Sequence, residues 1–393
     1  MDSTSGALGL VMGGGGARAA YQVGFLSCIG KHWPDLTIPI LTGVSAGAIN
    51  TAYLASHPGP FGAASADLAK LWSTLETESV MASDLGSFAT SVLRWSLRLV
   101  SGGNPLRPSV RGLVDTAPLR AFLERALGAE DGRIPGIGEN LRKGRISAVA
   151  VTTTDYATGQ SITHVQGKDP PMWRRPQRRS ERAEILVDHV MASAALPLFF
   201  PAVRVGGSWH GDGGVRLTAP LSPALRLGAD RILAISTRYQ KSQAEADMPV
   251  TSGYPPPAQV LGVLMNAIFL DMLDYDALTM ARINELIEAL PPERRGGLRV
   301  ARLLLMRPSR DLSAMAREYE PRLPQPLKFL TRGLGTRETR SPDSLSMVLF
   351  ERPYIEHMIE LGMQDAERRL EEIEAFLGGR ELPGMLRTGF WRV

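Results

Sequence analysis

The chain has 393 residues, of which 44% are apolar, and its formal net charge is only +4 at pH 7. This composition is typical of a soluble globular protein and gives no sign of a nucleic-acid partner. The single cysteine, Cys28, excludes an intrachain disulfide and fits a reducing compartment. Cys28 shares one helical face with Tyr21 and Phe25, so we expect a buried apolar side chain rather than a nucleophile.

No segment predicts targeting to, or passage through, a membrane. The first residues lack the basic region and the long apolar run of a signal peptide. The longest apolar stretch, Val260–Leu273, is interrupted by Asn266 and Asp271 and is short for a transmembrane helix. We therefore expect a cytoplasmic protein whose contact with a membrane, where it occurs, is peripheral.

A glycine-rich segment follows the first apolar run, Ala7–Met12, and precedes a helical pattern over Tyr21–Ile29. Strand, glycine loop and helix in this order present unpaired N–H groups at a positive helix end, where an anion can bind. Gly14, Gly15 and Gly16 lack the third glycine of a dinucleotide loop, and no Gly-Lys-Ser/Thr of a Walker loop follows. An oxyanion hole is the remaining functional interpretation. The alternative is a glycine-rich turn without a ligand.

The pentapeptide from Gly43 to Gly47 carries the strongest catalytic signal. It follows the apolar run Ile38–Thr42 and precedes a helical run, Ala46–Ser56. A Gly-x-Ser-x-Gly turn between a strand and a helix is the setting of a nucleophile elbow, which lifts the Oγ of Ser45 clear of the backbone. The alternative is that Ser45 caps an ordinary buried helix.

Strands and helices alternate over roughly the first 240 residues, which predicts an α/β sheet with helices on both sides. An apolar stripe over Phe88–Val100 suits either core packing or a membrane interface. The stretch Met172–Arg182 contains five arginines and predicts a solvated loop or a contact with anionic lipid headgroups. A helix is expected over Glu184–Ala195, and a hairpin over Val203–Trp209 leads to Asp212.

Asp212 lies among glycines just after the hairpin strand, so its backbone can approach another segment closely. It is the best candidate to accept the proton of Ser45. Aspartate is a weak base at its usual pKa of about 3.9, but a dry apolar site would raise that pKa. His210 shares a strand face with Asp212, which leaves a histidine-relayed triad as the alternative.

The last 150 or so residues predict a different pattern. A polar, proline-rich loop or lid is expected over Arg238–Gln259, followed by a long helical region over Gln259–Leu290. A strand over Leu298–Met306 precedes an irregular basic stretch, Pro308–Ser341. Helices are expected over most of Met347–Leu377.

Four motifs together resemble the patatin-like phospholipase family. They are Gly14-Gly15-Gly16-Ala17-Arg18, Gly43-Val44-Ser45-Ala46-Gly47, Ala192-Ser193 with Pro197 and Pro201, and Asp212-Gly213-Gly214. Each motif is loose, but four in this order at these spacings are highly specific. The resemblance covers Leu8–Thr237 and extends to Leu345–Ala366, which is similar to C-terminal parts of bacterial members.

The resemblance implies a three-layer α/β/α fold with a central, mostly parallel sheet. Residues 1–240 would form the catalytic domain, and residues 241–393 a C-terminal helical extension packed on it. It also implies a Ser–Asp dyad that hydrolyses carboxylic esters of phospholipids or other acyl lipids. Ser45 would be the nucleophile, Asp212 the base, and the N–H groups of Gly14 to Gly16 the oxyanion hole.

Arg18 matches the family's basic residue beside the glycine loop and would support anion binding, while Gly213 and Gly214 complete the aspartate motif. Ala19 stands where the family usually has glycine, which puts the loop geometry in question. One cysteine and the lack of a His-x-x-x-His pattern predict that no metal or organic cofactor is needed. The alternative is a non-catalytic lipid-binding or regulatory protein on the same fold.

Overall fold

A computed structural model describes residues 6–82, 112–249, 253–338 and 342–380 of the chain. The strands in these ranges form one sheet in the order β10–β9–β1–β2–β3–β4–β6–β5, with β8 on β3 and β7 on β8. Neighbours from β10 to β3 are parallel, β4 is antiparallel to β3, and β6 is parallel to β4. The bounds are β1 (Leu8–Met12), β2 (Ile40–Val44), β3 (Ala148–Asp155), β4 (Gln160–Gly167), β5 (Arg174–Arg175), β6 (Arg178–Arg182), β7 (Val203–Val205), β8 (Ser208–Asp212), β9 (Arg231–Ile235) and β10 (Arg302–Met306).

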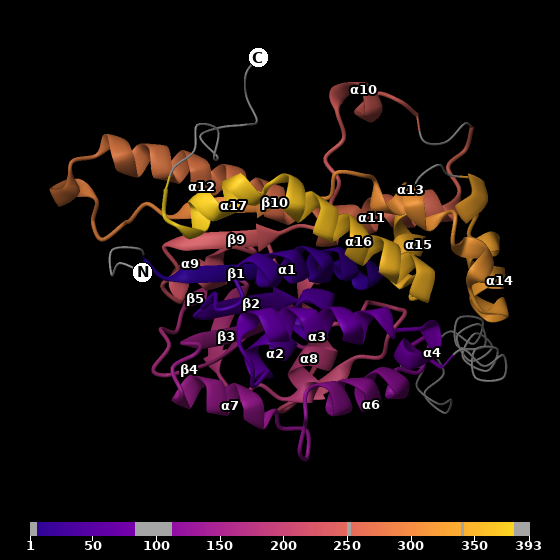
Figure 1. Ribbon diagram of the computed structural model, residues 1–393. Helices are drawn as coiled ribbons and strands as arrows, with labels where there is room; N and C mark the ends of the chain where they lie inside the picture. The colour runs from indigo at the N-terminus through magenta and orange to yellow at the C-terminus, as the bar shows by residue number, and fades with distance from the viewer. Residues whose placement is uncertain (1–5, 83–111, 250–252, 339–341, 381–393) are drawn as a thin grey trace.

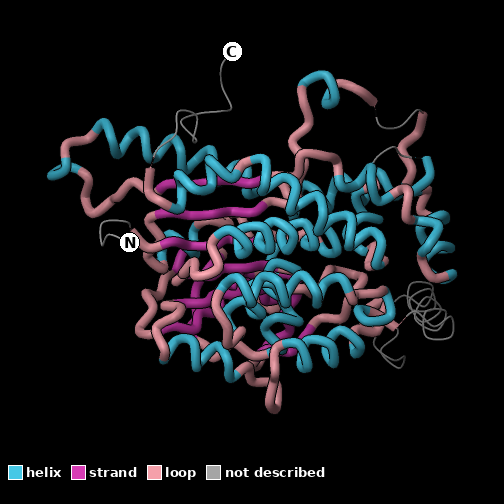
Figure 2. The backbone as a smooth tube through the Cα atoms, in the orientation of Figure 1, coloured by secondary structure: helices cyan, strands magenta, loops and turns pink. Residues whose placement is uncertain are grey.

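Helices cover both faces of this mostly parallel sheet and give the three-layer α/β/α fold that the sequence predicts (Figures 1 and 2). The principal covering helices are α1 (Ala20–His32), α2 (Ala46–Ser56), α3 (Phe61–Ser73) and α16 (Arg352–Arg368) on one face, and α9 (Ser222–Arg226) and α12 (Asp271–Ala289) on the other. The other helices are η1 (Gly16–Ala19), α4 (Thr77–Val80), α6 (Ala117–Ala126), α7 (Pro135–Arg142), α8 (Val187–Ser193), η2 (Gly213–Val215), α10 (Gln243–Ala246), α11 (Pro257–Phe269), η3 (Pro292–Arg294), α13 (Leu312–Ala316), η4 (Glu320–Arg322), α14 (Gln325–Gly333), η5 (Thr336–Glu338), α15 (Asp343–Val348) and α17 (Leu370–Leu377).

β1 shows why the central strands are continuous apolar runs. All five of its residues are buried. Leu10 and Met12 belong to the core under α1 and α2, while Val11 joins the core under α9 and α12 together with Leu273. A parallel strand that is covered on both faces has no solvent side, so it has no polar alternation.

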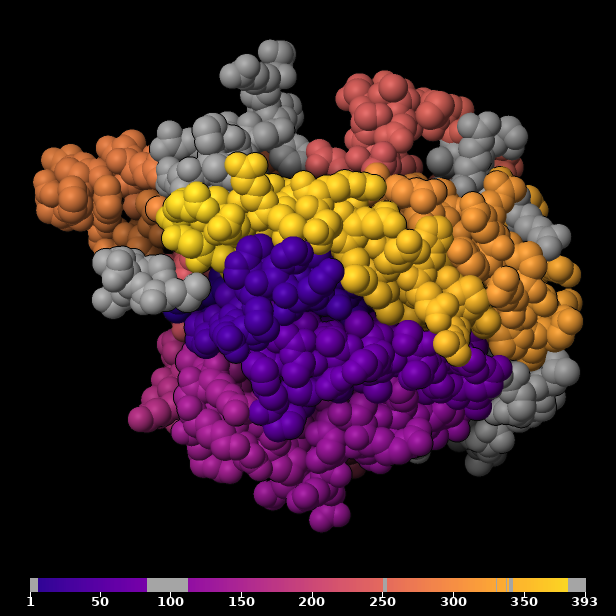
Figure 3. Space-filling model, in the orientation of Figure 1, coloured from indigo at the N-terminus to yellow at the C-terminus, as the bar shows by residue number. Residues whose placement is uncertain are grey.

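The C-terminal region completes the fold of the N-terminal part. β10 adds to the edge of the sheet beside β9, and α16 lies along α1 (Figure 1). Figure 3 shows the C-terminal segment, in yellow, lying against the N-terminal segment, in indigo. The helices α1 and α16 approach closely at Gly24 and Gly362. The space between them is so small that a Cβ on Gly24 would lie 1.9 Å from the carbonyl oxygen of Ile359. Residues 241–393 therefore supply a strand as well as helices, and the boundary at residue 240 stays a prediction.

Two C-terminal segments differ from the expectation. The helical region expected over Gln259–Leu290 is divided into α11 and α12, which meet at Leu270. The stretch Pro308–Ser341, expected to be irregular, contains α13 and α14. Leu312 of α13 and Leu327 of α14 are buried, and tertiary packing of this kind stabilises helices that are too short for a clear sequence pattern.

The arginine-rich segment Met172–Arg182 is not a loop. It forms the hairpin of β5 and β6, and β6 pairs with β4 at the edge of the sheet. Main-chain pairing with a neighbouring strand decides this conformation, although arginine is not a strong strand former. Its contact with anionic lipid stays a prediction. The helix expected over Phe88–Val100 lies outside the described residues.

One helical stretch, Pro257–Ala289, is long and apolar enough to cross a membrane by length and composition, with a mean hydropathy of 1.3 in its best window. By length and composition alone, the expectation that no stretch is long enough to cross a membrane is therefore wrong. Only 28% of that window is buried. The α12 half, however, buries Leu273, Ala277 and Met280 in the core of the sheet.

Candidate active site

Ser45 occupies a strained turn between β2 and α2. Its φ of 57° and ψ of −134° lie in a region that residues with a side chain rarely adopt. Gly47 allows this turn to lie against the end of β1, since a Cβ there would be 2.3 Å from the carbonyl oxygen of Met12. A Cβ on Gly43, the last glycine before the turn, would likewise lie only 2.4 Å from the carbonyl oxygen of Gly47. The strand, turn and helix expected around Ser45 are all present.

Asp212 is the last residue of β8, and the pairing of strands in the sheet brings it next to Ser45. β8 pairs with the carboxyl end of β3, where Thr153 faces Asp212 in register. Because β2 and β3 are parallel neighbours, their carboxyl ends meet at the same edge of the sheet. The Oγ of Ser45 donates a hydrogen bond of 2.6 Å to the Oδ2 of Asp212. The N–H of Gly214 donates one of 2.8 Å to Oδ1.

The carboxyl group of Asp212 is fully buried. Burial raises its pKa from the usual 3.8 to about 7, and the hydrogen bonds from Ser45 and Gly214 oppose part of that rise. A carboxylate with a pKa near neutrality accepts a proton far more readily than an exposed one. The raised pKa that the sequence interpretation required is therefore present in the fold.

Ser193 is a residue of the site to which the sequence interpretation gave no role. Its Oγ accepts a hydrogen bond of 3.0 Å from the N–H of Ser45 and donates one of 2.7 Å to the carbonyl oxygen of Thr152. It therefore ties the strained turn to β3. The motif Ala192-Ser193 was visible in the sequence, but only the packing of α8 against β3 reveals what Ser193 contacts.

The glycine loop lies directly beside the serine. Gly14 is so close that a Cβ on it would be 2.9 Å from the Cβ of Ser45. Gly15 and Gly16 line the same pocket as Ser45, and Gly16 begins η1. The first N–H groups of a helix have no partner within the helix. The loop thus brings donors of the kind that an oxyanion needs next to the hydroxyl of Ser45.

Arg18 does not serve the site as a free cation. Its guanidinium is buried and bonds to Asp343 at 2.8 Å, to Ser346 at 2.7 Å and to Ser313 at 2.6 Å. These partners belong to α13 and α15, so Arg18 joins the glycine loop to the C-terminal region. The role of Arg18 in anion binding stays a prediction. Ala19, where the family pattern has glycine, packs fully buried in the core.

The ring of His210 is hydrogen-bonded to a threonine of β3. Its Nδ1 lies 2.9 Å from the Oγ1 of Thr153, which also bonds to His164 at 2.9 Å. A third histidine, His189, packs edge-on against His164 at 4.4 Å between ring centroids. The hydrogen bonds of the described residues therefore connect Asp212 to Ser45 without an intervening histidine.

An apolar pocket opens beside Ser45. Most of its lining is aromatic or aliphatic, including Trp72, Phe122, Phe200, Phe269, Met347 and Phe350. Gly213 and Gly214 lie in η2, where Phe269, one of the pocket residues, packs closely against Gly214. Such a lining suits a hydrocarbon chain. Among the described residues, one group of metal-ligand side chains lies close together, and none of its members lines this pocket.

Residues 10–225 match the model of the family described as Patatin-like phospholipase. No curated protein sequence matches the chain.

Several solved structures resemble the chain over most of its length at 14% identity. Human GIVD cytosolic phospholipase A2 matches 95% of this chain and 60% of its own, with a TM-score of 0.46. VipD from Legionella pneumophila matches 88% of this chain and 66% of its own, with a TM-score of 0.33. The type III effector protein ExoU matches 97% and 83%, with a TM-score of 0.28. The chain thus spans less than two thirds of the length of the first two structures.

Proposed function

The chain belongs to the patatin-like phospholipase family, and from this membership we propose that it hydrolyses carboxylic esters of acyl lipids with Ser45 as nucleophile and Asp212 as general base. The observation that carries the proposal is the hydrogen bond of 2.6 Å from the hydroxyl of Ser45 to the fully buried carboxyl of Asp212. A nucleophile within hydrogen-bond reach of a base is the arrangement that acyl transfer requires.

The proton follows a short path in this mechanism. As the Oγ of Ser45 attacks the ester carbonyl carbon, its proton passes to the Oδ2 of Asp212. The tetrahedral intermediate then collapses, the bond to the alcohol breaks, and the alcohol leaves with the proton from Asp212. Water attacks the acyl-enzyme next, giving its proton to Asp212, which returns it to the Oγ of Ser45 as the fatty acid departs. One carboxyl group serves as base and acid in turn.

The negative oxygen of the intermediate is held by the N–H groups of Gly14 to Gly16 in this proposal. Its support is that Gly15 and Gly16 line the pocket with Ser45, at the start of η1. Fixed donors in a site that excludes water stabilise a developing oxyanion strongly. The aromatic pocket takes the acyl chain, which places the ester carbonyl between the loop and the serine.

A lipid surface is the proposed source of the substrate, and α11 is the element that meets it. No charged residue occurs between Asp247 and Asp271. The exposed side chains of α11 are apolar, with Val260 at 48%, Val263 at 57% and Leu264 at 53% exposure. At its far end, Phe269 lines the pocket beside Ser45. An apolar helix that joins the pocket to the surface suits peripheral insertion among lipids.

The neighbouring helix α14 extends this surface. Leu261 of α11 and Leu327 of α14 line the same small apolar pocket, and Phe329 of α14 is 80% exposed. Lys328 and Arg332 stand beside it and suit anionic headgroups. We favour contact over a membrane-spanning role because α12 is held in the core, and its Asp274 pairs with Arg238 and Arg307 at 2.6 Å each.

The test of the hydrolase proposal uses a short-chain p-nitrophenyl ester, which needs no lipid surface. Ser45→Ala should lower turnover by several orders of magnitude, since it removes the nucleophile. Ser56→Ala, at the other end of α2, is the matched control and should keep full turnover. A fluorophosphonate should label Ser45. Wild-type activity in Ser45→Ala would contradict Ser45 as the nucleophile. A wild type that shows no turnover and is not labelled would support the non-catalytic lipid-binding alternative.

A further inference from the structure

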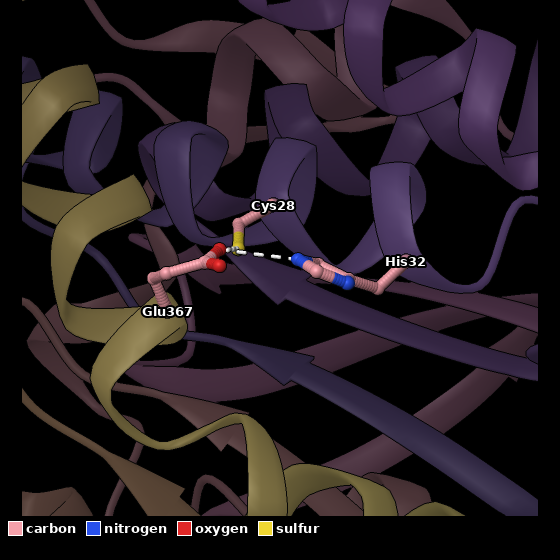
Figure 4. Close-up of side chains that lie close together, drawn as sticks. All are labelled: Cys28, His32 and Glu367. Carbon is pink, nitrogen blue, oxygen red and sulfur yellow. Dashed lines mark hydrogen bonds and ion pairs between the residues drawn. The ribbon is translucent and has the colours of Figure 1, made fainter.

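Three side chains of metal-ligand type meet on the surface between α1 and α16, away from the pocket. Cys28 and His32 are four residues apart on α1, which places them on the same face of the helix. Glu367 points toward both from α16 (Figure 4). The Sγ, Nε2 and carboxylate oxygen of this group all lie within 4.8 Å of one another. We propose that Cys28, His32 and Glu367 bind a zinc ion that joins the two helices.

The spacing of the donor atoms fits tetrahedral zinc. The Sγ of Cys28 lies 3.2 Å from the Oε2 of Glu367, and the Nε2 of His32 lies 3.1 Å from the same oxygen. With usual zinc–ligand bond lengths, a tetrahedral ion separates sulfur and oxygen by about 3.5 Å, and nitrogen and oxygen by about 3.3 Å. The sulfur–oxygen and nitrogen–oxygen distances are therefore within a few tenths of an ångström of those that the ion requires, and the sulfur and the nitrogen lie within 4.8 Å of each other.

The chemistry of the donors selects zinc. A thiolate, an imidazole and a carboxylate are the ligand types that zinc accepts, whereas magnesium and calcium prefer oxygen alone. When zinc binds, the thiol of Cys28 loses its proton to solvent. The thiolate and the carboxylate of Glu367 then balance the two positive charges of the ion. Lys31 is a nearby cation whose charge weakens binding without preventing it.

The site has one buried ligand, Cys28, and two ligands that face solvent, His32 and Glu367. Cys28 is 2% exposed, whereas the side chains of His32 and Glu367 are 33% and 57% exposed. An ion can therefore enter from solvent, with water as its fourth ligand. Because none of the three residues lines the pocket beside Ser45, the site stabilises the packing of α16 on α1 and is separate from the hydrolytic chemistry.

The experiment uses full-length protein, freed of metal with a chelator and kept reduced, and titrates it with zinc alone and with cobalt alone. We expect one zinc per chain, a melting temperature raised by several degrees, and a thiolate-to-cobalt charge-transfer band. Cys28→Ser should abolish that band, and Glu367→Gln should weaken binding by more than the roughly 10–100-fold that an outer-shell partner contributes. Hydrolysis of a soluble ester should not change.

The matched control is His57→Ala, which removes another histidine that pairs with a carboxylate, Asp67, at 3.3 Å but has no thiol beside it. This variant should bind zinc as the wild type does. Circular dichroism verifies the fold of each variant. Undiminished binding by Cys28→Ser, cobalt binding without the charge-transfer band, or no retained metal would overturn the proposal. The three side chains would then be a hydrogen-bonded cluster only.

Discussion

The carboxyl group of Asp212 combines two requirements at the scale of the single residue. It must be ionised to accept the proton of Ser45, yet its complete burial opposes ionisation. The outcome is a pKa of about 7, at which both forms are populated near neutrality. Two hydrogen bonds, from Ser45 and Gly214, keep the ionised form accessible.

The pKa of Asp212 predicts the pH dependence of hydrolysis. Only the ionised carboxylate accepts the proton, so the second-order rate constant kcat/KM should rise with pH and level off above about 7. The measurement is kcat/KM for a soluble ester between pH 5 and 9, with Ser56→Ala as the control. A rate that is flat from pH 5 upward would contradict the assignment, since it would require a base that is ionised throughout.

At the scale of the element, α11 stands out because packing within the protein does not cover its apolar side chains. It contains no charged residue and leaves three aliphatic side chains about half exposed. Its inner end contacts the site through Phe269. In the proposed function, this helix links the lipid surface to the pocket beside Ser45.

We expect the double change Val263→Asp and Leu264→Asp to lower binding to vesicles of phosphatidylcholine and phosphatidylglycerol at least about tenfold, because each buried charge opposes insertion. Hydrolysis of a soluble ester should stay near wild type. Leu286→Asp on α12 is the matched control, since Leu286 is 67% exposed and lies far along the chain from the site. Sedimentation with vesicles measures the effect. Unchanged vesicle binding would contradict a docking role for α11. So would a loss of soluble-ester hydrolysis as large as the loss of vesicle binding.

The sequence predicts the elements whose signals are local. The strand, turn and helix around Ser45, the glycine loop, and the hairpin before Asp212 all follow from patterns of a few residues. What the sequence does not reveal is contact between distant segments. Ser193 bonds to the N–H of Ser45 across 148 positions, and Arg18 reaches α15 across more than 300. Such partners are set by packing, which no local pattern encodes.

At the scale of the whole molecule, three buried histidines make the fold sensitive to acid. His164, His189 and His210 lie together near β3, and burial is the main cause that lowers the pKa of each. The pKa of His189 falls to about 4, against 6.5 in an unfolded chain. Between these values the unfolded state binds more protons than the folded state, so stability decreases as pH falls.

Asp212 acts in the opposite direction over the same range. Its pKa is raised in the folded state, so the folded state takes up a proton between about pH 7 and 4 and gains stability as pH falls. Burial also raises the pKa of Asp271, Asp276 and Glu351, which act in the same direction as Asp212. We expect the three histidines together to outweigh these carboxyl groups and the melting temperature to fall from pH 6.5 to 4. Asp212→Asn should show a steeper fall because it removes the opposing group. Thermal unfolding at several pH values measures both curves, and a wild-type curve without decline would contradict this account.

The most direct test of the dyad compares Asp212→Asn with His210→Ala in the hydrolysis of one soluble ester. Asp212→Asn keeps the shape of the side chain and removes its basicity, while His210→Ala removes a ring whose described partner is Thr153. The account predicts that Asp212→Asn is as inactive as Ser45→Ala and that His210→Ala keeps substantial activity, with circular dichroism confirming both folds. If His210→Ala is instead as inactive as Ser45→Ala, a histidine relays the proton and the dyad is wrong.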